Sequence, residues 1–209
     1  MGNERKSIWL VMITLPYHLI LASNSPRRKE LLEGLNIPFE VKVLPDIEEN
    51  YPSTLPAHSV AEYIAVEKAT AYKSVITPTD LVLTADTVVI VNNKVLGKPK
   101  NAEEAKAMLH LLSGKTHSVV TGVCLTATTF QKHFSVETHV TFKCLTSSEI
   151  DYYIKTFKPF DKAGAYGIQE WIGYIGVTQL QGSYFNVMGL PVQRIWEALQ
   201  QMTSLSIDI

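Results

Sequence analysis

The chain has 209 residues, of which 46% are hydrophobic and 19% are charged. This composition excludes a disordered chain. The chain is long enough for one large core, with or without a smaller lobe. A formal net charge of -1 gives no overall positive field to gather nucleic acid, so any anion must be held by a local cluster of cations. Cys124 and Cys144 are too few for a disulfide framework or a zinc knuckle, which favours a cytoplasmic protein.

Residues 1–16 are predicted to be an extension ahead of a single domain over residues 17–209. A basic pair followed by an apolar run over residues 5–15 has the look of a short signal peptide. The run is stopped by Pro16 before it is long enough to cross a bilayer. We therefore expect neither a membrane span nor a removed leader, and Met12 is an alternative start.

Strand and helix patterns alternate after residue 16 without a linker or an internal repeat, which predicts an α/β fold. The expected strands cover residues 17–22, 39–43, 81–91, 95–96, 118–128, 134–145 and 174–180. The expected helices start near residues 26, 59, 101, 146 and 191. Ser59, Asn101 and Thr146 are each followed three residues later by a glutamate, the pattern of a capping box. Asn92-Asn93 indicates a hairpin turn, so the sheet should be mixed rather than purely parallel.

The first predicted helix begins with two cations, in the sequence Ser25-Pro26-Arg27-Arg28. The serine suits the N-cap and the proline the first helical position, so both arginines fall in the first turn. The helix dipole disfavours each cation there by roughly 0.3–1 kcal/mol. A bound anion would reverse this penalty, because free backbone N–H groups and guanidinium forks both suit phosphate oxygens. The alternative is that the arginines extend into solvent or pair with glutamates further along the helix.

Asp86 lies inside the apolar, β-rich run of residues 81–90. Burying an unpaired charge costs several kcal/mol, so this carboxylate needs a cation, a metal or hydrogen-bond donors, or its pKa should rise. The alternative is an outward-facing residue on a solvated face. The predicted hairpin could bring Lys98 back toward Asp86 to pair with it or to bind a phosphate, although a loop lysine is by default a solvated charge.

Two loops offer further candidates. The acidic run of residues 46–49 could supply carboxylate ligands to a divalent cation, or it could simply be solvated. The Gly-rich residues 161–169 would let the backbone approach a ligand closely, and they end in Gln169, whose amide could read a base edge. A plain loop could look the same. The histidines show no zinc-binding spacing, and the sequence contains no P-loop or dinucleotide-binding motif.

Taken in order, these segments resemble the Maf family of nucleoside triphosphate pyrophosphatases over about residues 17–200. The motifs that carry the resemblance are residues 23–28, 67–69, 85–89, 97–99, 112–114, 161–169 and 189–191. The resemblance implies an elongated mixed sheet flanked by helices around a central cleft, as in inosine triphosphate pyrophosphatases, and often a homodimer. It also implies a reaction in which water attacks the α-phosphorus of a nucleoside triphosphate, giving the monophosphate and pyrophosphate.

The resemblance assigns roles to single residues. Asp86 would be the proton acceptor, while Arg27, Thr87 and Gln169 would influence substrate choice. Residues implied to bind the substrate are Ser23, Ser25, Arg28, Lys68 and Lys98. A divalent metal cation (Mg, Mn or Co) would complete the site, with Glu49 as a ligand and Glu48 as the alternative. Asp86 could act as base, metal ligand or both.

The sequences Ala85-Asp86-Thr87 and Tyr166-Gly167-Ile168-Gln169 look like the branch that acts on dTTP and UTP, and sometimes on CTP and modified pyrimidines. The leading hypothesis is therefore a metal-dependent pyrophosphatase that keeps such nucleotides out of nucleic acids, with a nucleotide as its partner rather than nucleic acid or membrane. The alternative is a nucleotide-binding regulator of septum formation and cell division without significant catalysis. One departure from the family is Glu170-Trp171, where Trp171 could narrow or stack on the base pocket.

Overall fold

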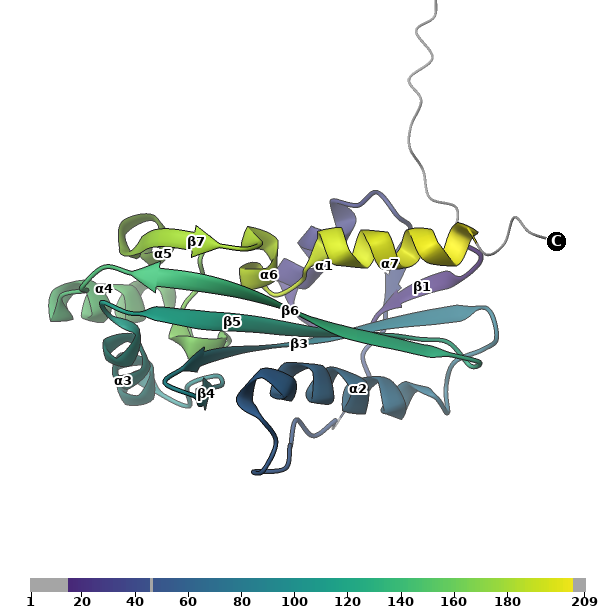
Figure 1. Cartoon of the computed structure of the whole chain (residues 1–209), viewed down its shortest axis with the longest axis horizontal. Helices are drawn as coiled ribbons and strands as arrows, with labels where there is room; N and C mark the ends of the chain where they lie inside the picture. The colour runs from purple at the N-terminus through teal and green to yellow at the C-terminus, as the bar shows by residue number, and fades with distance from the viewer. Residues whose placement is uncertain (1–14, 46, 205–209) are drawn as a thin grey trace, which may run out of the picture.

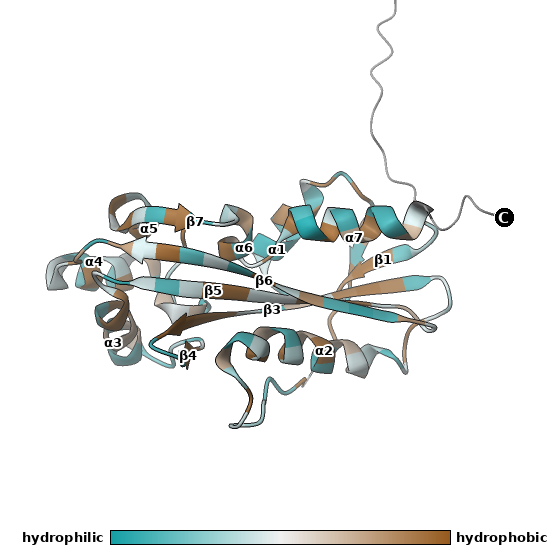
Figure 2. Ribbon diagram, in the orientation of Figure 1, coloured by the Kyte–Doolittle hydropathy of each residue, from teal (hydrophilic) through white to brown (hydrophobic). Residues whose placement is uncertain are grey.

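The longest apolar run of the sequence forms the central strand, β3 (Asp80–Val91), which is buried along nearly its whole length. The structure is a computed structural model that describes residues 15–45 and 47–204. β3 pairs in parallel with β1 (His18–Leu21) and antiparallel with β5 (Thr116–Thr126). Because both faces of β3 are apolar, it can lie only in the interior of a sheet covered on both sides (Figure 2).

The sheet follows the order β2-β1-β3-β5-β6-β7 in the described part of the chain, and β4 pairs with β3. The remaining strands are β2 (Phe39–Val41), β4 (Lys94–Leu96), β6 (Gln131–Phe142) and β7 (Val177–Gln181). Asn92 and Asn93 both have positive φ, as a tight hairpin turn requires, and the sheet combines parallel and antiparallel pairs. The predicted mixed α/β fold is confirmed.

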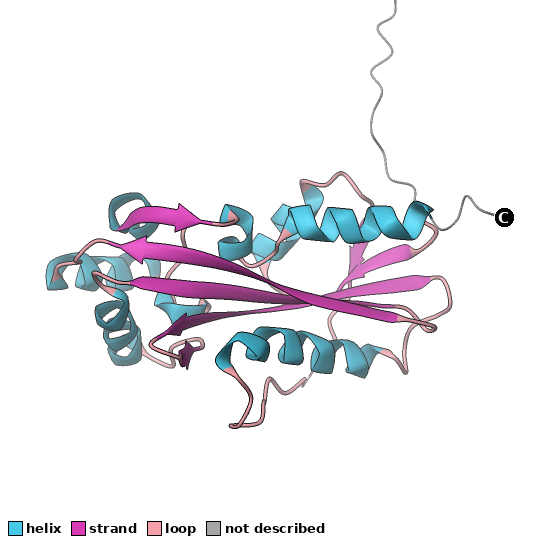
Figure 3. Cartoon of the chain, in the orientation of Figure 1, coloured by secondary structure: helices cyan, strands magenta, loops and turns pink. Residues whose placement is uncertain are grey.

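Helices cover both faces of this elongated sheet (Figures 1 and 3). They are α1 (Pro26–Glu33), α2 (Val60–Tyr72), α3 (Ala102–Leu112), α4 (Ser147–Phe157), α5 (Trp171–Gly176), α6 (Tyr184–Met188) and α7 (Val192–Ser204). Two short 3-10 turns cover Ala57–Ser59 and Ala163–Ala165. One core joins α1 and α7 to β1, β3 and β5, while α2 packs on β3 and β5 through separate clusters. A further core gathers α3, α4 and α5 at one end of the long axis.

Close packing of α2 depends on Gly122 of β5. A Cβ atom at this position would lie 2.3 Å from the carbonyl carbon and oxygen of Ala61, far inside van der Waals contact. Only glycine therefore allows the α2 backbone to rest directly on the sheet at this point. Gly122 pairs with Asp86 in the β3–β5 register, so this contact lies opposite the strand position that the sequence singles out.

A stretch of β3 has an open edge. β1 pairs with β3 only as far as Leu83, and β4 takes up the same edge again at Val89. Between these two positions no strand in the described residues pairs with that edge of β3. Asp86 and Thr87 lie in this open stretch, so the sheet itself leaves room for a site beside them.

The three predicted helix caps have different outcomes in the structure. Thr146 forms the predicted capping box, and the Asn101 side chain caps α3, but Glu104 accepts from the Lys100 N–H rather than from Asn101. Ser59 makes no side-chain cap, because the 3-10 turn before α2 already places it in helical backbone geometry.

Most predicted strands match the observed bounds to within two residues, and two strands differ by three residues. β7 begins only at Val177, since residues 171–176 form α5. β6 ends at Phe142, so Cys144 lies beyond the strand. The predicted extension over residues 1–16 lies almost wholly outside the described residues, and the single domain over residues 17–209 stays a prediction.

Candidate active site

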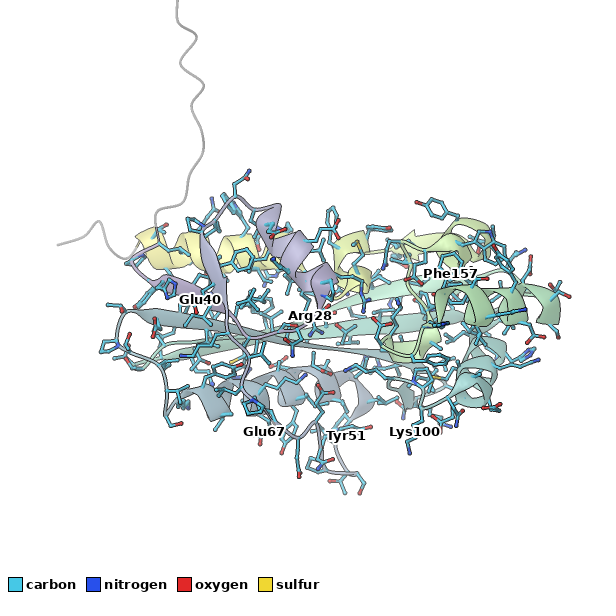
Figure 4. All side chains as sticks on the ribbon, turned by 180° about the vertical axis from the view of Figure 1, so that it is seen from behind. Arg28, Glu40, Tyr51, Glu67, Lys100 and Phe157 are labelled. Carbon is cyan, nitrogen blue, oxygen red and sulfur yellow. The ribbon has the colours of Figure 1, made fainter. Side chains whose placement is uncertain are left out.

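The open edge of β3 borders a cavity of about 810 Å³. Its walls come from the turn after β1, the start of α1, the loop that follows β2, α2, β3, the segment that precedes α5 and the end of α6. Figure 4 labels Arg28 near the middle of the long axis, at the end of α1 that faces the sheet. The predicted site residues that line this cavity are Ser23, Ser25, Arg27, Arg28, Glu49, Lys68, Asp86, Thr87, Lys98 and Gln169.

The start of α1 is built as predicted. The Ser25 side chain accepts a hydrogen bond from the Arg28 N–H, and Pro26 occupies the first turn. The Arg28 guanidinium turns back over the sheet, where Nε donates to the Gly189 carbonyl at 2.9 Å and Nη2 donates to Thr87 Oγ1 at 3.2 Å. Burial lowers the pKa of Arg28, while the charges of nearby carboxylates oppose this shift. Arg28 is therefore a partly buried cation held within the cavity wall.

Arg27 points to the other side of the cavity. Its Nη1 lies 2.8 Å from Asp161 Oδ2 in an ion pair. Burial raises the pKa of Asp161, but hydrogen bonds from Lys162 and Arg27 outweigh it and lower the pKa to about 2. Neither arginine pairs with the glutamates of its own helix, so the solvated alternative for this turn is wrong.

Asp86 is buried with only 8% of its surface exposed, and it has a cationic partner. Lys68 Nζ on α2 lies 2.8 Å from Asp86 Oδ1 and 2.7 Å from Glu49 Oε1, so one ammonium joins two carboxylates. Lys98 Nζ lies 3.7 Å from Glu49 Oε2 and does not pair with Asp86 as one alternative proposed. Burial raises the pKa of Asp86, against the opposing charges of Lys68 and Arg28.

From the residues alone, Lys68 reads as an ordinary surface residue, because Glu67-Lys68 is a common pattern on a solvated helix face; only the family resemblance singles it out. The signal that could have placed it is the pair of alanines on either side, Ala65 and Ala69, which are fully buried against β5. A lysine at the margin of such a small-residue face reaches the sheet edge with its ammonium while its stem lies along the packed face.

The two acidic-loop candidates separate in the structure. Glu49 lines the cavity, whereas Glu48 Oε2 accepts a hydrogen bond from Asn50 Nδ2 at 2.7 Å and does not line it. Asp46 lies outside the described residues. Within residues 15–45 and 47–204, no group of three or more His, Cys, Asp and Glu side chains could hold a metal ion.

The carboxylates of Glu49 and Asp86 are the candidate ligands for a metal ion in this cavity. Hard divalent cations such as Mg²⁺ are commonly held by one or two carboxylates together with substrate phosphates and water. Glu49 and Asp86 already share one cation, the ammonium of Lys68, and supply oxygen ligands of this type. The carboxylates of the site therefore fit a metal that arrives together with phosphate oxygens.

The glycine-rich segment closes the cavity on the side of Asp161. Gly164 has φ of +66° and donates its N–H to the Gly97 carbonyl at 3.0 Å, which ties the segment to the loop that carries Lys98. Gln169 Oε1 is buried and has no hydrogen-bond partner among the described residues. A buried acceptor without a partner costs about 1–3 kcal/mol, so this amide is poised for a ligand that donates.

Trp171 does not line the cavity. Its ring packs edge-on against Tyr152 of α4, with centroids 4.8 Å apart. Glu170, the other departure from the family pattern, accepts a hydrogen bond from Tyr153 and pairs with Lys162 at 3.0 Å. Both residues brace the segment that carries Gln169 from outside the cavity.

The described residues include no helix that has both the length and the apolar character to span a membrane. The fold and the cavity together define an α/β protein with a cleft lined by cations: arginines and lysines from α1, α2 and the β4 loop lie around a buried carboxylate at the open edge of the central strand.

Comparison with known proteins identifies the family. Residues 18–202 match the family described as Maf-like protein, and the chain belongs to it. A protein of Phocaeicola vulgatus named dTTP/UTP pyrophosphatase is 60% identical over 186 residues, which cover 89% of this chain and 96% of that protein. Proteins of the same name from Bacteroides thetaiotaomicron and Parabacteroides distasonis are each 53% identical; the alignments cover 89% and 88% of this chain and 96% and 95% of those proteins.

Proposed function

We propose that this chain is a nucleoside triphosphate pyrophosphatase that hydrolyses dTTP and UTP to the monophosphate and pyrophosphate, with CTP and modified pyrimidine nucleotides as further candidate substrates. Such an activity would keep these nucleotides out of nucleic acids. The observation that carries the proposal is the buried Asp86 held by Lys68 in a cavity walled by arginines and lysines. The names of the similar proteins support the choice of substrate.

The cations suit a triphosphate. Arg27, Arg28, Lys68 and Lys98 all line one cavity, and they come from separate elements. Phosphoryl transfer asks a protein mainly to position the chain of phosphates and to neutralise the charge that develops on their oxygens. Arg28 suits this role best, because hydrogen bonds to the Gly189 carbonyl and to Thr87 hold its guanidinium in place before the substrate arrives.

Asp86 is suited to take the proton of the attacking water. A general base works best when its pKa is close to the operating pH, and burial raises the pKa of Asp86 in that direction. Lys68 binds Oδ1, so Oδ2 is the oxygen that would accept the proton. The water would then attack the α-phosphorus, and pyrophosphate would leave.

A divalent cation, Mg²⁺, Mn²⁺ or Co²⁺, would be held by Glu49 and Asp86 together with phosphate oxygens, and when bound it would neutralise phosphate charge. The proximity of the two carboxylates to Lys68 supports this assignment. Glu49 stays ionised at neutral pH, because burial raises its pKa but the hydrogen bond and charge of Lys68 outweigh it and lower the pKa below its ordinary value.

Gln169 is suited to read the base. Its buried Oε1 needs a donor, and the N3–H of thymine and uracil or the amino group of cytosine would supply one. The apolar side chains of Val89, Val119, Val187 and Met188 also line the cavity and would accept the face of a flat ring.

The test is a panel of nucleoside triphosphates with Mg²⁺, Mn²⁺ or Co²⁺, with pyrophosphate release as the readout. Asp86→Asn keeps the shape of the side chain but removes its basicity, and it should abolish release from dTTP and UTP. The matched control is Asp151→Asn, an exposed carboxylate on α4 that pairs with Lys106. Full activity of Asp86→Asn would refute the assignment of the base.

Triphosphate binding without pyrophosphate release under all three metals would instead favour the nucleotide-binding regulator of septum formation. Neither outcome depends on the oligomeric state or the cellular location. The homodimer and the cytoplasmic location therefore stay predictions.

A further inference from the structure

A chain of hydrogen bonds runs from Arg28 into the interior of the protein. Arg28 Nη2 donates to Thr87 Oγ1 at 3.2 Å, Thr87 Oγ1 lies 2.9 Å from Thr121 Oγ1, and Thr121 Oγ1 donates to the Asn186 carbonyl at 3.0 Å. Thr121 is on β5, directly opposite Thr87 in the β3–β5 register, and it is completely buried. No substrate can therefore touch Thr121.

The direction of each hydrogen bond follows from the number of protons available. A hydroxyl group has one hydrogen to donate. Thr121 uses its hydrogen on the Asn186 carbonyl, which can only accept, so Thr87 must donate to Thr121. Thr87 then has no proton left for a phosphate or carbonyl oxygen of the substrate, and it meets Arg28 as an acceptor.

The far end of this chain returns to Arg28. Asn186 and Gly189 belong to one turn at the end of α6, where the Gly189 N–H donates to the Asn186 carbonyl at 3.0 Å and Gly189 has φ of +114°. The Gly189 carbonyl accepts from Arg28 Nε at 2.9 Å. One turn thus holds the guanidinium twice, once directly and once through the two threonines.

This turn is itself held rigidly. The completely buried Asn186 side chain donates from Nδ2 to the Val119 carbonyl at 3.1 Å and to Thr138 Oγ1 at 3.0 Å, which ties it to β5 and β6. A donor set whose positions are held before binding loses little entropy when a charged ligand arrives.

We propose that Thr121 is a positioning residue for the anion-binding guanidinium of Arg28, acting through Thr87, and that Thr87 affects the reaction by holding Arg28 rather than by contacting the base. The proposal rests on the proposed function in so far as the anion is a triphosphate. It assigns a part in substrate binding to Thr121 and Asn186, two buried residues that do not line the cavity.

The experiment compares Thr121→Val, which keeps the shape and loses the hydroxyl, with Thr121→Ser, which keeps the hydroxyl. Inorganic tripolyphosphate, which has no base or sugar, is titrated into each protein by calorimetry. Losing one hydrogen bond from the chain should weaken tripolyphosphate binding roughly three- to tenfold in Thr121→Val and leave Thr121→Ser close to the unaltered protein. The matched control is Thr116→Val on the same strand, whose hydroxyl partner is Thr141 at 2.8 Å, away from the cavity.

Two further measurements separate positioning from a merely structural role. KM for dTTP and for UTP should rise by the same factor in Thr121→Val, because the lost contact concerns phosphates and not the base. Combined with Arg28→Lys, the Thr121→Val change should have little additional effect, since two residues that act through one contact are not additive. Thr87→Val gives the same comparison from the cavity side if Thr121→Val does not fold.

Unchanged tripolyphosphate binding in Thr121→Val, or an equal loss in the Arg28→Lys background, would overturn the proposal, as would absence of tripolyphosphate binding by the unaltered protein. Unequal changes for dTTP and UTP would also overturn it, because Thr87 would then contact the base or sugar. If neither nucleotide is hydrolysed at all, the proposed function fails, while calorimetry still decides the role of Thr121.

Discussion

Acidification should destabilise this protein through a single buried histidine, His117 on β5. Its side chain is sealed in the interior, with the residue only 2% exposed, and its Nε2 lies 2.8 Å from Tyr166 Oη. The ring also packs edge-on against Phe142 and Tyr166 at centroid distances of 5.2 and 5.4 Å. Burial lowers the pKa of His117 from 6.5 to about 4, because the protein interior solvates the charged imidazolium less well than water does.

The sign and size of the effect follow from proton linkage. As the pH falls below 6.5 the unfolded chain binds a proton at His117, whereas the folded protein stays neutral there until about pH 4. The unfolded state therefore binds more protons in this window, and the free energy of unfolding falls as the pH falls. At about 1.4 kcal/mol per pKa unit, the full loss is on the order of 3 kcal/mol.

Urea unfolding at several pH values between 4 and 7.5 would measure this loss against His117→Gln, a polar side chain that does not titrate and still reaches toward Tyr166. The variant should be less stable at pH 7.5 because ring packing is lost, and its deficit should shrink by up to about 3 kcal/mol toward pH 4. His110→Gln on α3 controls for removing a histidine outside the core. Parallel curves for the parent and His117→Gln would refute the reasoning.

Two further substitutions test the ion pair of Asp86 and the packing of α2 on the sheet. Lys68→Met removes the cation that opposes the raised pKa of Asp86, so the pKa of Asp86 should rise further. The acid limb of the pH profile for pyrophosphate release should then move to higher pH. The control is Lys106→Met, which should leave this limb in place; an unmoved limb in Lys68→Met would contradict the prediction. Gly122→Ala places a methyl group 2.3 Å from the Ala61 carbonyl and should lower the free energy of unfolding by about 3 kcal/mol or more. The control is Gly97→Ala, whose methyl group meets nothing within 4 Å. Equal urea midpoints for the two variants would show that α2 moves away without cost.

Local sequence signals predicted most of the fold because each acts through its immediate neighbours. Asn92-Asn93 adopt the positive φ of a hairpin turn, and Thr146 with Glu149 form the predicted capping box. The sequence does not predict the helix α5, because residues 171–176 combine two aromatics and two isoleucines, which favour a strand, with two glycines, which disfavour a helix. Gly173 explains the difference: a Cβ there would lie 1.8 Å from the Ile168 carbonyl, so contact with the preceding segment, not propensity, decides the conformation.

The candidate site was predictable in part for the same reason. The position of Asp86 in an apolar strand shows that its carboxylate needs a partner, and the start of α1 shows that its arginines need an anion or an acceptor. Which cation meets Asp86 depends on how α2 lies across the sheet, and the sequence pattern of α2 alone does not contain that information. Similarly, Arg27 and Arg28 are neighbours in sequence, but their side chains reach Asp161 and Gly189 on different segments.

The adjacent positions of Asp86 and Thr87 explain why one strand can serve both halves of the site. Successive side chains of a strand point to opposite faces, so Asp86 meets Lys68 on the α2 side while Thr87 meets Arg28 on the α1 side. A register shift of one residue would exchange the two faces and separate the carboxylate from its lysine. Gly122, which pairs with Asp86, keeps Lys68 within reach, because any larger residue at that position would push α2, and Lys68 with it, away from the sheet.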